Sequence, residues 1–405
     1  MSLNRRQFLR RSSFGFTAGL LLPKLRAAGA NDRIGIGMIG CGTRGRHLFT
    51  QLARNRKKCN ITVAAVCDVW RVARERMADQ VEERFGRRPK CFSRYQELLE
   101  LLDVDGVTIA TPDFVHSPIL SAAARAGKDA YCEKPMAMTL EQANDALAVV
   151  RQERRVVQIG TQRRSSEQFR AAAALIASGV LGRLVEIETG WHDDKPRWER
   201  RVDDWKAADV DWPAFLGELP ARPFDPRRLV CWQLYRDYSL GPVGLLGSHL
   251  IDVATWFAGD PYPRSAVAHG GTFTWTEREQ PDLIECLYEF PSGFLLRYST
   301  RLANSRHQPE ATFYGTRGIF DTDSWQARPD GGGEERLAAP VDVEPPPEGV
   351  GHLRNWLDCL RSREDPNATV EMGHAHSVAA ILANRALWSG RKQLYDAERR
   401  EIRSA

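Results

Sequence analysis

The 405-residue sequence has no run of about 18 or more apolar residues outside its N-terminal region, the length that a membrane-spanning helix needs. We therefore expect no membrane span in the mature protein. Its 42% hydrophobic and 27% charged residues are ordinary for a soluble globular protein. The length predicts about two domains.

The usual metal-binding patterns are also missing. None of the eight cysteines forms a C-x-x-C pair, and no H-E-x-x-H segment occurs. His374 and His376 are two residues apart in a predicted helix, and side chains with that spacing do not face one another. The sequence therefore predicts no metal site. We expect the cysteines to be mostly free and buried, because several lie in apolar runs.

Acidic residues are absent from residues 1–30, which carry six basic residues, Arg5 and Arg6 among them. Without this segment the chain is nearly neutral, so its charge gives no reason to expect nucleic-acid binding. An apolar stretch over residues 14–23 and then Ala28-Gly29-Ala30 follow the arginines. In this order they resemble a twin-arginine export signal, which implies the export machinery as a partner and a periplasmic or secreted protein. A basic, disordered arm is the alternative.

Strand-like and helix-like segments alternate through residues 31–155. Short apolar runs at residues 33–40, 61–67, 106–110 and 129–132 are typical of buried parallel strands. Helical patterns lie between and after them, at residues 44–54, 71–85, 94–102, 116–126 and 140–153. This alternation predicts an α/β domain, a Rossmann doubly wound parallel sheet.

The pattern changes near residue 155. Strand-like segments follow at residues 183–192, 264–275, 282–290, 293–300 and 311–321. They predict an α+β domain over residues 156–345 with a largely antiparallel open sheet, whose last three strands form a meander. The Trp-, Pro- and Arg-rich residues 195–240 predict a long structured loop that shapes a binding site. Residues 346–405 predict two helices, at 352–362 and 373–390, that pack back on the Rossmann domain.

A dinucleotide fingerprint follows the first predicted strand. Gly40-Cys41-Gly42-Thr43-Arg44-Gly45 matches G-x-G-x-x-G, whose glycines allow a tight turn, a close approach of the pyrophosphate, and close packing of helix on strand. Asp68 ends the second strand, where a carboxylate meets the ribose 2′-OH. That carboxylate would repel a 2′-phosphate, so the sequence favours NAD over NADP, although the nearby Arg71 softens the preference.

Two further motifs stand at the ends of the later strands. Thr111-Pro112-Asp113-Phe114-Val115-His116 follows the predicted strand at 106–110, and Glu133-Lys134-Pro135 follows the one at 129–132. With the glycine fingerprint they resemble the Gfo/Idh/MocA oxidoreductases, such as glucose–fructose oxidoreductase and inositol dehydrogenase. Members oxidise or reduce sugars, inositols and related polyols with a nicotinamide cofactor. The resemblance implies that Lys134 is the catalytic acid/base beside the nicotinamide.

Residues 241–252 resemble the second catalytic segment of the family, and His249 matches its active-site histidine. Asp252 lies three residues later and is a candidate substrate ligand. The sequence departs from the family at Leu245, where its polyol dehydrogenases usually carry an aspartate four residues before the histidine. A leucine neither orients Lys134 nor stabilises its charge, and Asp237 and Tyr238 are unsupported substitutes.

The candidate site is therefore as follows. The predicted cofactor-binding residues are Gly40, Gly42, Thr43, Arg44, Gly45, Asp68, Thr111, Pro112, His116, Glu133 and Lys134. The predicted catalytic residues are Lys134 and His249, and the predicted substrate-binding residues are Arg163, Arg164 and Asp252. Five further aromatic residues are candidates for a sugar platform: Trp191, His192, Trp198, Trp205 and Trp212.

Three functions fit these residues. The first is an NAD(P)-dependent oxidoreductase acting on a sugar, polyol or sugar derivative. The second is an NAD-dependent glycosidase or lyase in which a sugar carbon is oxidised transiently and the cofactor is recycled. The third is a non-catalytic sugar-binding homologue, against which the intact motifs argue. Because the periplasm offers little free NAD, we expect the cofactor to be tightly bound, and the family resemblance implies a homo-oligomer, a dimer or a tetramer.

Overall fold

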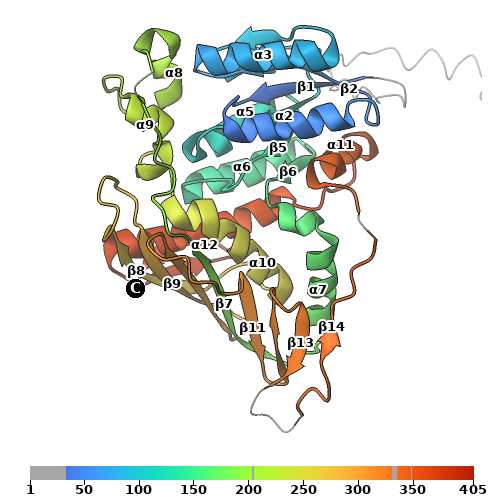
Figure 1. Ribbon diagram of the computed structural model, residues 1–405, viewed down its shortest axis with the longest axis vertical. Coiled ribbons are helices and arrows are strands. Elements are labelled where there is room, and N and C mark those ends of the chain that lie inside the picture. Colours follow the sequence, from blue (N-terminus) through green and yellow to red (C-terminus); the bar gives the residue numbers. More distant parts are fainter. Residues whose placement is uncertain (1–32, 203–204, 331–334, 348) are drawn as a thin grey trace, which may run out of the picture. The chain divides into compact units, whose positions relative to one another are not determined.

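A computed structural model describes residues 33–202, 205–330, 335–347 and 349–405, so the predicted export signal at residues 1–30 lies outside the described residues. Residues Arg33–Ala405 form one unit built on two sheets (Figure 1). In the described part of the chain, no helix has both the length and the apolar character that crossing a membrane requires.

The first sheet has six strands, all parallel, in the order β3-β2-β1-β4-β5-β6. The strands are β1 (Ile34–Ile39), β2 (Ile61–Cys67), β3 (Lys90–Phe92), β4 (Gly106–Ile109), β5 (Asp129–Cys132) and β6 (Val157–Ile159). All six residues of β1 are buried, which explains its continuous apolar sequence. The strand order reverses between β1 and β4, and ligands of open α/β sheets bind beyond the carboxyl ends of the strands at such a point.

Helices cover both faces of this sheet. One face packs against α2 (Thr43–Asn55), α3 (Arg71–Phe85) and α11 (His352–Ser362), and the other against α4 (Tyr95–Leu99), α5 (His116–Arg125) and α6 (Leu140–Gln152) (Figure 1). Alternate residues of β1 supply the two cores, with Met38 on the first face and Ile39 on the second. The fold class predicted for this half is therefore confirmed.

The second sheet is larger and mostly antiparallel, in the order β14-β13-β12-β11-β7-β10-β9-β8-β15-β16. Its strands are β7 (Leu184–His192), β8 (Ser265–Gly271), β9 (Leu283–Glu289), β10 (Leu295–Arg301), β11 (Ala311–Gly315), β12 (Gly318–Asp321), β13 (Gln326–Pro329), β14 (Val341–Asp342), β15 (Gln393–Asp396) and β16 (Glu401–Ser404). One face packs against α7 (Glu167–Ala177), α10 (Ser248–Ala258) and α12 (Val370–Ser389). The predicted α+β class with a largely antiparallel open sheet is confirmed as well.

The predicted meander is wrong in part. β9 and β10 form a hairpin because a tight turn at Pro291–Gly293 joins them, but β10 pairs next with β7, in parallel. β11 then lies on the other side of β7. The connection over residues 302–310 is long enough to cross β7, so adjacency in the sequence does not fix adjacency in the sheet. The strand predicted at 311–321 is also two strands, β11 and β12, paired with each other.

The described residues of the segment 193–240 have little regular structure, in keeping with the long structured loop predicted for residues 195–240, but they have an aromatic core of their own. Short helices α8 (Trp212–Leu216) and α9 (Pro226–Val230) begin at Asp211 and Asp225, whose carboxylates accept backbone N–H groups. Their apolar side chains pack with Phe114, which follows β4, and with Tyr238. This segment therefore packs against the loops at the carboxyl edge of the first sheet.

Candidate functional site

The glycine fingerprint forms the turn between β1 and α2. Gly40 has a φ of +94°, and a Cβ there would lie 2.5 Å from the Ala110 carbonyl oxygen. A Cβ on Gly45 would lie 2.0 Å from the Gly40 oxygen, so a side chain there would force the helix away from the strand. A Cβ on Gly42 would have no other atom within 4 Å. Gly42 precedes the first residue of α2, and no side chain caps the helix there. Free N–H groups and an unobstructed approach are what a bound pyrophosphate requires, so this loop fits a dinucleotide.

Asp68 lies directly after β2. Its carboxylate accepts the Cys41 N–H at 2.7 Å and the Trp70 N–H at 2.8 Å, and burial raises its pKa despite these two bonds. The side chain is thereby fixed at the ribose end of the fingerprint. Arg71 points instead toward Asp209, with 2.5 Å between Nη2 and Oδ1.

A pocket of about 1520 Å³ opens at this edge of the sheet. Seven of the predicted cofactor-binding residues line it: Gly40, Gly42, Thr43, Arg44, Asp68, Thr111 and Pro112. The Thr111 hydroxyl is buried and has no hydrogen-bond partner among the described residues, as expected of a group that awaits a ligand. The opposite wall comes from the segment 193–240, with Trp198, Arg200, Trp205 and Trp232 among its lining residues.

His116 does not face this pocket, although the sequence predicts that it contacts the cofactor. It is 1% exposed. Its ring nitrogens lie 2.8 Å from the Pro135 oxygen and 2.9 Å from the Thr111 oxygen. The ring therefore joins the loops that follow β4 and β5 from behind, and its role is to position them.

Lys134 and Glu133 follow β5 and lie beside the pocket rather than on its lining. Glu133 accepts the Arg44 Nε–H at 2.5 Å, which ties this loop to the glycine fingerprint. The Lys134 Nζ donates to the Leu245 carbonyl oxygen at 2.6 Å. Burial lowers the pKa of Lys134, the carboxylates of Asp113 and Glu133 oppose this shift, and the guanidinium of Arg44 adds to it.

The second catalytic segment begins as a π-helix over Val243–Gly247 and continues as α10. π-helical turns are rare and frequent at functional sites. His249 is the second residue of α10, and its Nδ1 is buried without a partner among the described residues. Burial, followed by the charges of Lys134, Arg163 and Arg44, lowers the pKa of His249 well below its usual value. The structure thus brings a neutral imidazole near Lys134.

Arg164 and Asp252, both predicted to bind substrate, form an ion pair with each other. The Arg164 Nε lies 3.0 and 2.8 Å from the two carboxylate oxygens, and the guanidinium also covers the ring of Trp256. Their side chains are 7% and 1% exposed, so this is a buried ion pair that joins α10 to the end of the first sheet. Arg163 is paired as well, with Glu310, but that carboxylate is 43% exposed. Of the three predicted substrate-binding residues, Arg163 is the one whose side chain is partly exposed, at 18%.

Comparisons with known proteins agree with this geometry. Residues 34–161 match the model of the oxidoreductase family with an NAD-binding Rossmann fold, and residues 221–321 match the GFO/IDH/MocA C-terminal domain. Together the two matches cover more than half of the chain. The chain belongs to the GFO/IDH/MocA oxidoreductase family.

Proteins that are similar to this GFO/IDH/MocA chain carry different names. A glycosyl hydrolase family 109 protein of Stenotrophomonas maltophilia is 29% identical over 205 residues, which are 48% of this chain and 43% of that protein. The levoglucosan dehydrogenase of Pseudarthrobacter phenanthrenivorans is 25% identical over 231 residues, 56% of this chain and 52% of that protein. The chain thus matches about half of the length of these relatives.

Among solved structures, the aldose-aldose oxidoreductase of Caulobacter crescentus superposes with a TM-score of 0.67 at 20% identity. The match covers 89% of this chain and 99% of that one. At this identity the likeness concerns the fold, and both sheets of this GFO/IDH/MocA chain share it.

The aromatic residues proposed for a sugar platform divide in three. Trp212 is buried and stacks on Phe215 at 4.9 Å, so it belongs to the core of the segment 193–240. Trp205 lines the pocket and stacks on Trp70 with ring centroids 3.8 Å apart. Trp198 also lines the pocket and has a φ of +70°, which is strained for a bulky residue and is typical of functional sites.

The remaining two candidates, Trp191 and His192, end β7 and lie outside the lining of the pocket. Trp191 packs against the same apolar cluster as Trp198, around Leu245 and Leu246. The aromatic wall of the pocket therefore continues to the residue whose carbonyl accepts from Lys134.

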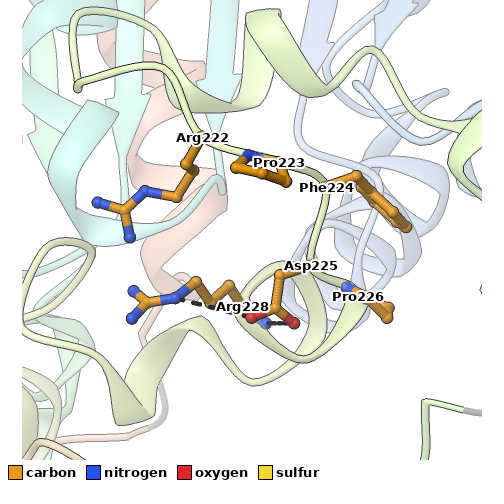
Figure 2. A pocket seen from close by; sticks show the side chains of 6 residues that line it. All are labelled: Arg222, Pro223, Phe224, Asp225, Pro226 and Arg228. Atoms are coloured by element: carbon orange, nitrogen blue, oxygen red, sulfur yellow. Dashed lines mark hydrogen bonds and ion pairs between the residues drawn. The ribbon is translucent and has the colours of Figure 1, made fainter.

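A second, smaller hollow of about 450 Å³ lies on the segment 193–240 of this GFO/IDH/MocA protein. Figure 2 shows Arg222 and Arg228 pointing the same way on one side of it and Phe224 pointing away from them. None of the residues predicted to bind cofactor or substrate lines it. Its arginines are already paired with carboxylates, so we assign the chemistry to the large pocket.

Sequence reasoning missed two contributors to the site. The first is the backbone carbonyl of Leu245, because a motif search weighs side chains only. The second is Asp113, which lies within the Thr111–His116 motif and is 1% exposed. A carboxylate in a motif directly after a buried strand was a signal that the sequence offered.

Proposed function

We propose that this protein is an NAD-dependent oxidoreductase that transfers a hydride at a CH–OH group of a sugar, polyol or sugar derivative. The observation that carries the proposal is the placement of Lys134. Its ammonium is held by the Leu245 carbonyl at 2.6 Å, beside the fingerprint loop and near the neutral His249. The levoglucosan dehydrogenase and aldose-aldose oxidoreductase named among its relatives support a sugar as substrate.

The residues at hand divide the work of such a reaction. NAD, when bound, supplies the hydride acceptor. In the oxidative direction the neutral amine of Lys134 takes the proton of the substrate hydroxyl while the hydride leaves the same carbon, and in reduction it returns that proton. The neutral imidazole of His249 is suited to orient the hydroxyl through a hydrogen bond. Arg163, still within reach of solvent, is the remaining cation for further substrate oxygens.

The preference for NAD and its tight retention are part of this proposal. Asp68 argues against a 2′-phosphate, as in the sequence-based argument. Support for retention comes from the segment 205–219, which is fastened across the ribose side of the pocket. Trp205 stacks on Trp70, the Asp211 N–H donates to the Val69 oxygen at 2.9 Å, and Arg94 pairs with Asp211 at 3.3 Å. Residues of this segment line the pocket, so we expect these contacts to slow the release of a bound nucleotide.

The alternative function is an NAD-dependent glycosidase or lyase with an internally recycled cofactor. The similarity to glycosyl hydrolase family 109 proteins favours it, and a retained cofactor suits it. Both functions use Lys134 and the same pocket. They differ in the product, because only the glycosidase or lyase cleaves a glycosidic bond.

Export and assembly complete the proposal. We propose that the N-terminal segment directs twin-arginine export to the periplasm, which cell fractionation of the wild type and the Arg5→Lys/Arg6→Lys double variant tests. We also propose a homo-oligomer, since the uncovered face of the second sheet exposes apolar side chains at Val185, Val267, Leu287 and Leu295. Light scattering at several concentrations tests it, and a monomer throughout would contradict it.

The reaction is tested by adding single sugars, pairs of sugars and glycosides to the purified protein. We expect a sugar to reduce the bound nicotinamide and a second aldose to reoxidise it, as read from the nicotinamide absorbance. The Lys134→Ala variant serves as the control that keeps the pocket but not the chemistry. Release of a free sugar from a glycoside without net nicotinamide reduction would favour the alternative. No change in absorbance and no product with any substrate would overturn both.

A further inference from the structure

Lys134 has no ion-pair partner among the described residues. Its ammonium donates to the Leu245 carbonyl, which is neutral and cannot balance a full charge. Glu133 lies next to it in the chain but is engaged by Arg44 at 2.5 Å. A buried ammonium without a compensating charge is costly, so a carboxylate near Lys134 would strongly affect its protonation.

Asp113 is in the right place to be that carboxylate. It begins the short 3₁₀ turn Asp113–Val115 that follows β4, and Lys134 follows β5. β4 and β5 are neighbouring parallel strands, with Ile109 opposite Cys132, so the two loops leave the same edge of the sheet side by side. The charge of Asp113 raises the pKa of Lys134, and the charge of Lys134 lowers the pKa of Asp113.

The Asp113 side chain is fixed from the second half of the chain. One carboxylate oxygen accepts the Ser239 hydroxyl at 2.8 Å, and the Ser239 oxygen in turn accepts the Gly241 N–H at 3.0 Å. Residues 239–241 lead directly into the π-helix that carries Leu245. The same backbone segment therefore holds Asp113 through Ser239 and Lys134 through the Leu245 carbonyl.

We propose that Asp113 is the positioning residue of Lys134. Asp113 supplies, from the first sheet, the negative charge that Leu245 in the second half of the chain does not supply. The inference rests on the proposed role of Lys134 as acid/base. Asp113 itself neither gains nor loses a proton in the reaction. Its negative charge stabilises the protonated form of Lys134, which arises when the amine takes the proton of the substrate oxygen.

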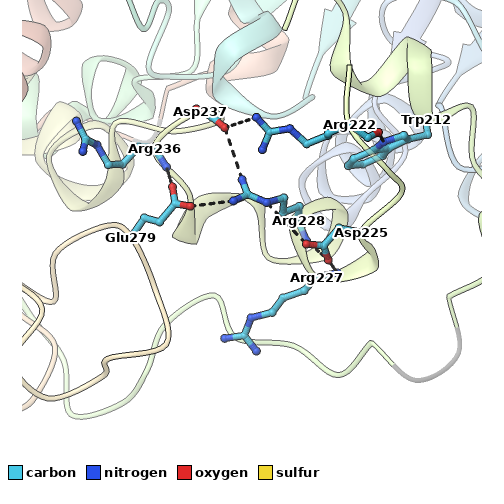
Figure 3. Close-up of polar contacts among 8 residues, drawn as sticks. All are labelled: Trp212, Arg222, Asp225, Arg227, Arg228, Arg236, Asp237 and Glu279. Atoms are coloured by element: carbon cyan, nitrogen blue, oxygen red, sulfur yellow. Dashed lines mark hydrogen bonds and ion pairs between the residues drawn. The ribbon is translucent and has the colours of Figure 1, made fainter. Parts of the chain in front are cut away.

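The rival carboxylates are already paired. Figure 3 shows Asp237 between two guanidinium groups, 2.8 Å from Arg222 Nη2 and 3.6 Å from Arg228 Nη1. The same arginine, Arg228, also contacts Glu279 at 2.9 Å. Asp237, a substitute considered from the sequence, therefore belongs to an arginine cluster, while Asp113 has no arginine or lysine in salt-bridge contact among the described residues.

Protonation of this pair depends on several neighbours. Burial raises the pKa of Asp113 to about 7, and Lys134, Ser239 and the Leu240 N–H oppose the rise. Around Lys134, Asp113 and Glu133 raise its pKa, whereas Arg44 and Arg163 lower it. Lys134 in turn lowers the pKa of His249 and of His376. Asp113 and Lys134 therefore titrate as a coupled pair within one cluster.

The test measures the protonation of Lys134 directly. The wild type and the Asp113→Asn and Asp237→Asn variants are treated with cyanate, which reacts with neutral amines, across a range of pH. Carbamylation of Lys134 is quantified by peptide mass spectrometry relative to the exposed Lys206. We expect Asp113→Asn to move the Lys134 curve about one pH unit or more toward acid, because an opposite charge is lost. The matched Asp237→Asn variant should leave the curve in place.

A second measurement needs no substitution. In the wild type the coupling predicts a Lys134 curve with two steps, because the amine reacts more readily while Asp113 is protonated. An unchanged curve in a folded Asp113→Asn variant would overturn the inference, and so would a single step in the wild type. Because carbamylation requires no turnover, a shifted curve in a protein without redox activity would refute the proposed function and leave this inference standing.

Discussion

The two walls of the large pocket are built in different ways. On one side, loops at the ends of β1, β2 and β4 are held by the parallel sheet beneath them, and fingerprint glycines, which present only backbone, line the pocket. On the other side, the described residues of the range 198–237 have little regular structure, and aromatic stacks and ion pairs hold them in place. The first wall follows from strand pairing, whereas the second depends on particular side chains.

This difference separates two tasks. A wall made of backbone is suited to bind the pyrophosphate, which is common to all dinucleotides. The glycines that such a wall requires can be recognised in the sequence. A wall made of tryptophan and arginine side chains is suited to decide what else enters and how long it stays. Substitutions on the first side should therefore affect chemistry or folding, and those on the second side should affect retention and specificity.

The largest effect is expected at Lys134. The Lys134→Ala variant should lose about 10²–10⁴-fold in kcat, because general acid/base catalysis supplies factors of that size. Its nucleotide content should equal that of the wild type, since Lys134 does not line the pocket. Steady-state rates and nucleotide content measured on the same preparation check both statements. Loss of the nucleotide together with the activity would mean that the two walls do not divide the work as described.

Arg164 and Arg163 give a matched pair for stability. Asp252→Asn leaves the Arg164 cation buried without its carboxylate, which should lower the free energy of unfolding by about 3–5 kcal/mol. Glu310→Gln removes the partly exposed partner of Arg163 and should cost about 1 kcal/mol or less. Urea unfolding of both variants measures the difference. Equal losses would return Arg164 to the candidate substrate ligands.

Acid should weaken the first sheet through His352. This side chain joins α11 to the end of β6, with Nε2 2.8 Å from the Ile159 oxygen, and burial lowers its pKa to about 4. Its folded pKa lies below the value of about 6.5 in the unfolded chain, so its contribution is complete above pH 6.5 and is lost as the pH falls toward 4, by about 3 kcal/mol in total. Unfolding free energies from pH 7 to 4 check this, and the slope should flatten in His352→Gln. An identical slope in that variant would assign the acid sensitivity to other groups.

The smallest effect concerns the second wall. Trp205→Ala removes the stack on Trp70 and should speed nucleotide release about tenfold, since aromatic pairs contribute about 0.5–1.5 kcal/mol beyond burial. Trp388→Ala, on α12 and outside the pocket lining, is the control. Release is followed by exchange against labelled NAD. If both variants release nucleotide at the wild-type rate, Trp205 is not part of what retains it.

The sequence foretold the first wall far better than the second. The strand at 61–67 and the helix at 352–362 coincide with β2 and α11, because buried strands and amphipathic helices leave periodic patterns. The glycine fingerprint and Asp68 could also be recognised in the sequence, because the backbone geometry of this loop dictates those residue types. The position of β7 between β10 and β11 could not be predicted from the sequence, because long connections do not specify strand order.

The contacts of several candidate site residues could not be read from the sequence, for a common reason. Arg164 and Asp252 are indistinguishable in sequence from substrate ligands, and only their burial against each other shows that they form an internal ion pair. His116 fits a cofactor motif, but its ring faces two backbone carbonyls. Pairing between distant residues is a property of packing, and one sequence does not display it.

Above all, we propose that the large pocket holds a retained nicotinamide dinucleotide beside Lys134. This proposal is tested by purifying the protein without added cofactor, denaturing it, and identifying any released nucleotide by mass spectrometry and absorbance. We predict NAD or NADH in an amount equal to that of the protein. A protein that contains no nucleotide and binds neither added NAD(H) nor NADP(H) would contradict the account.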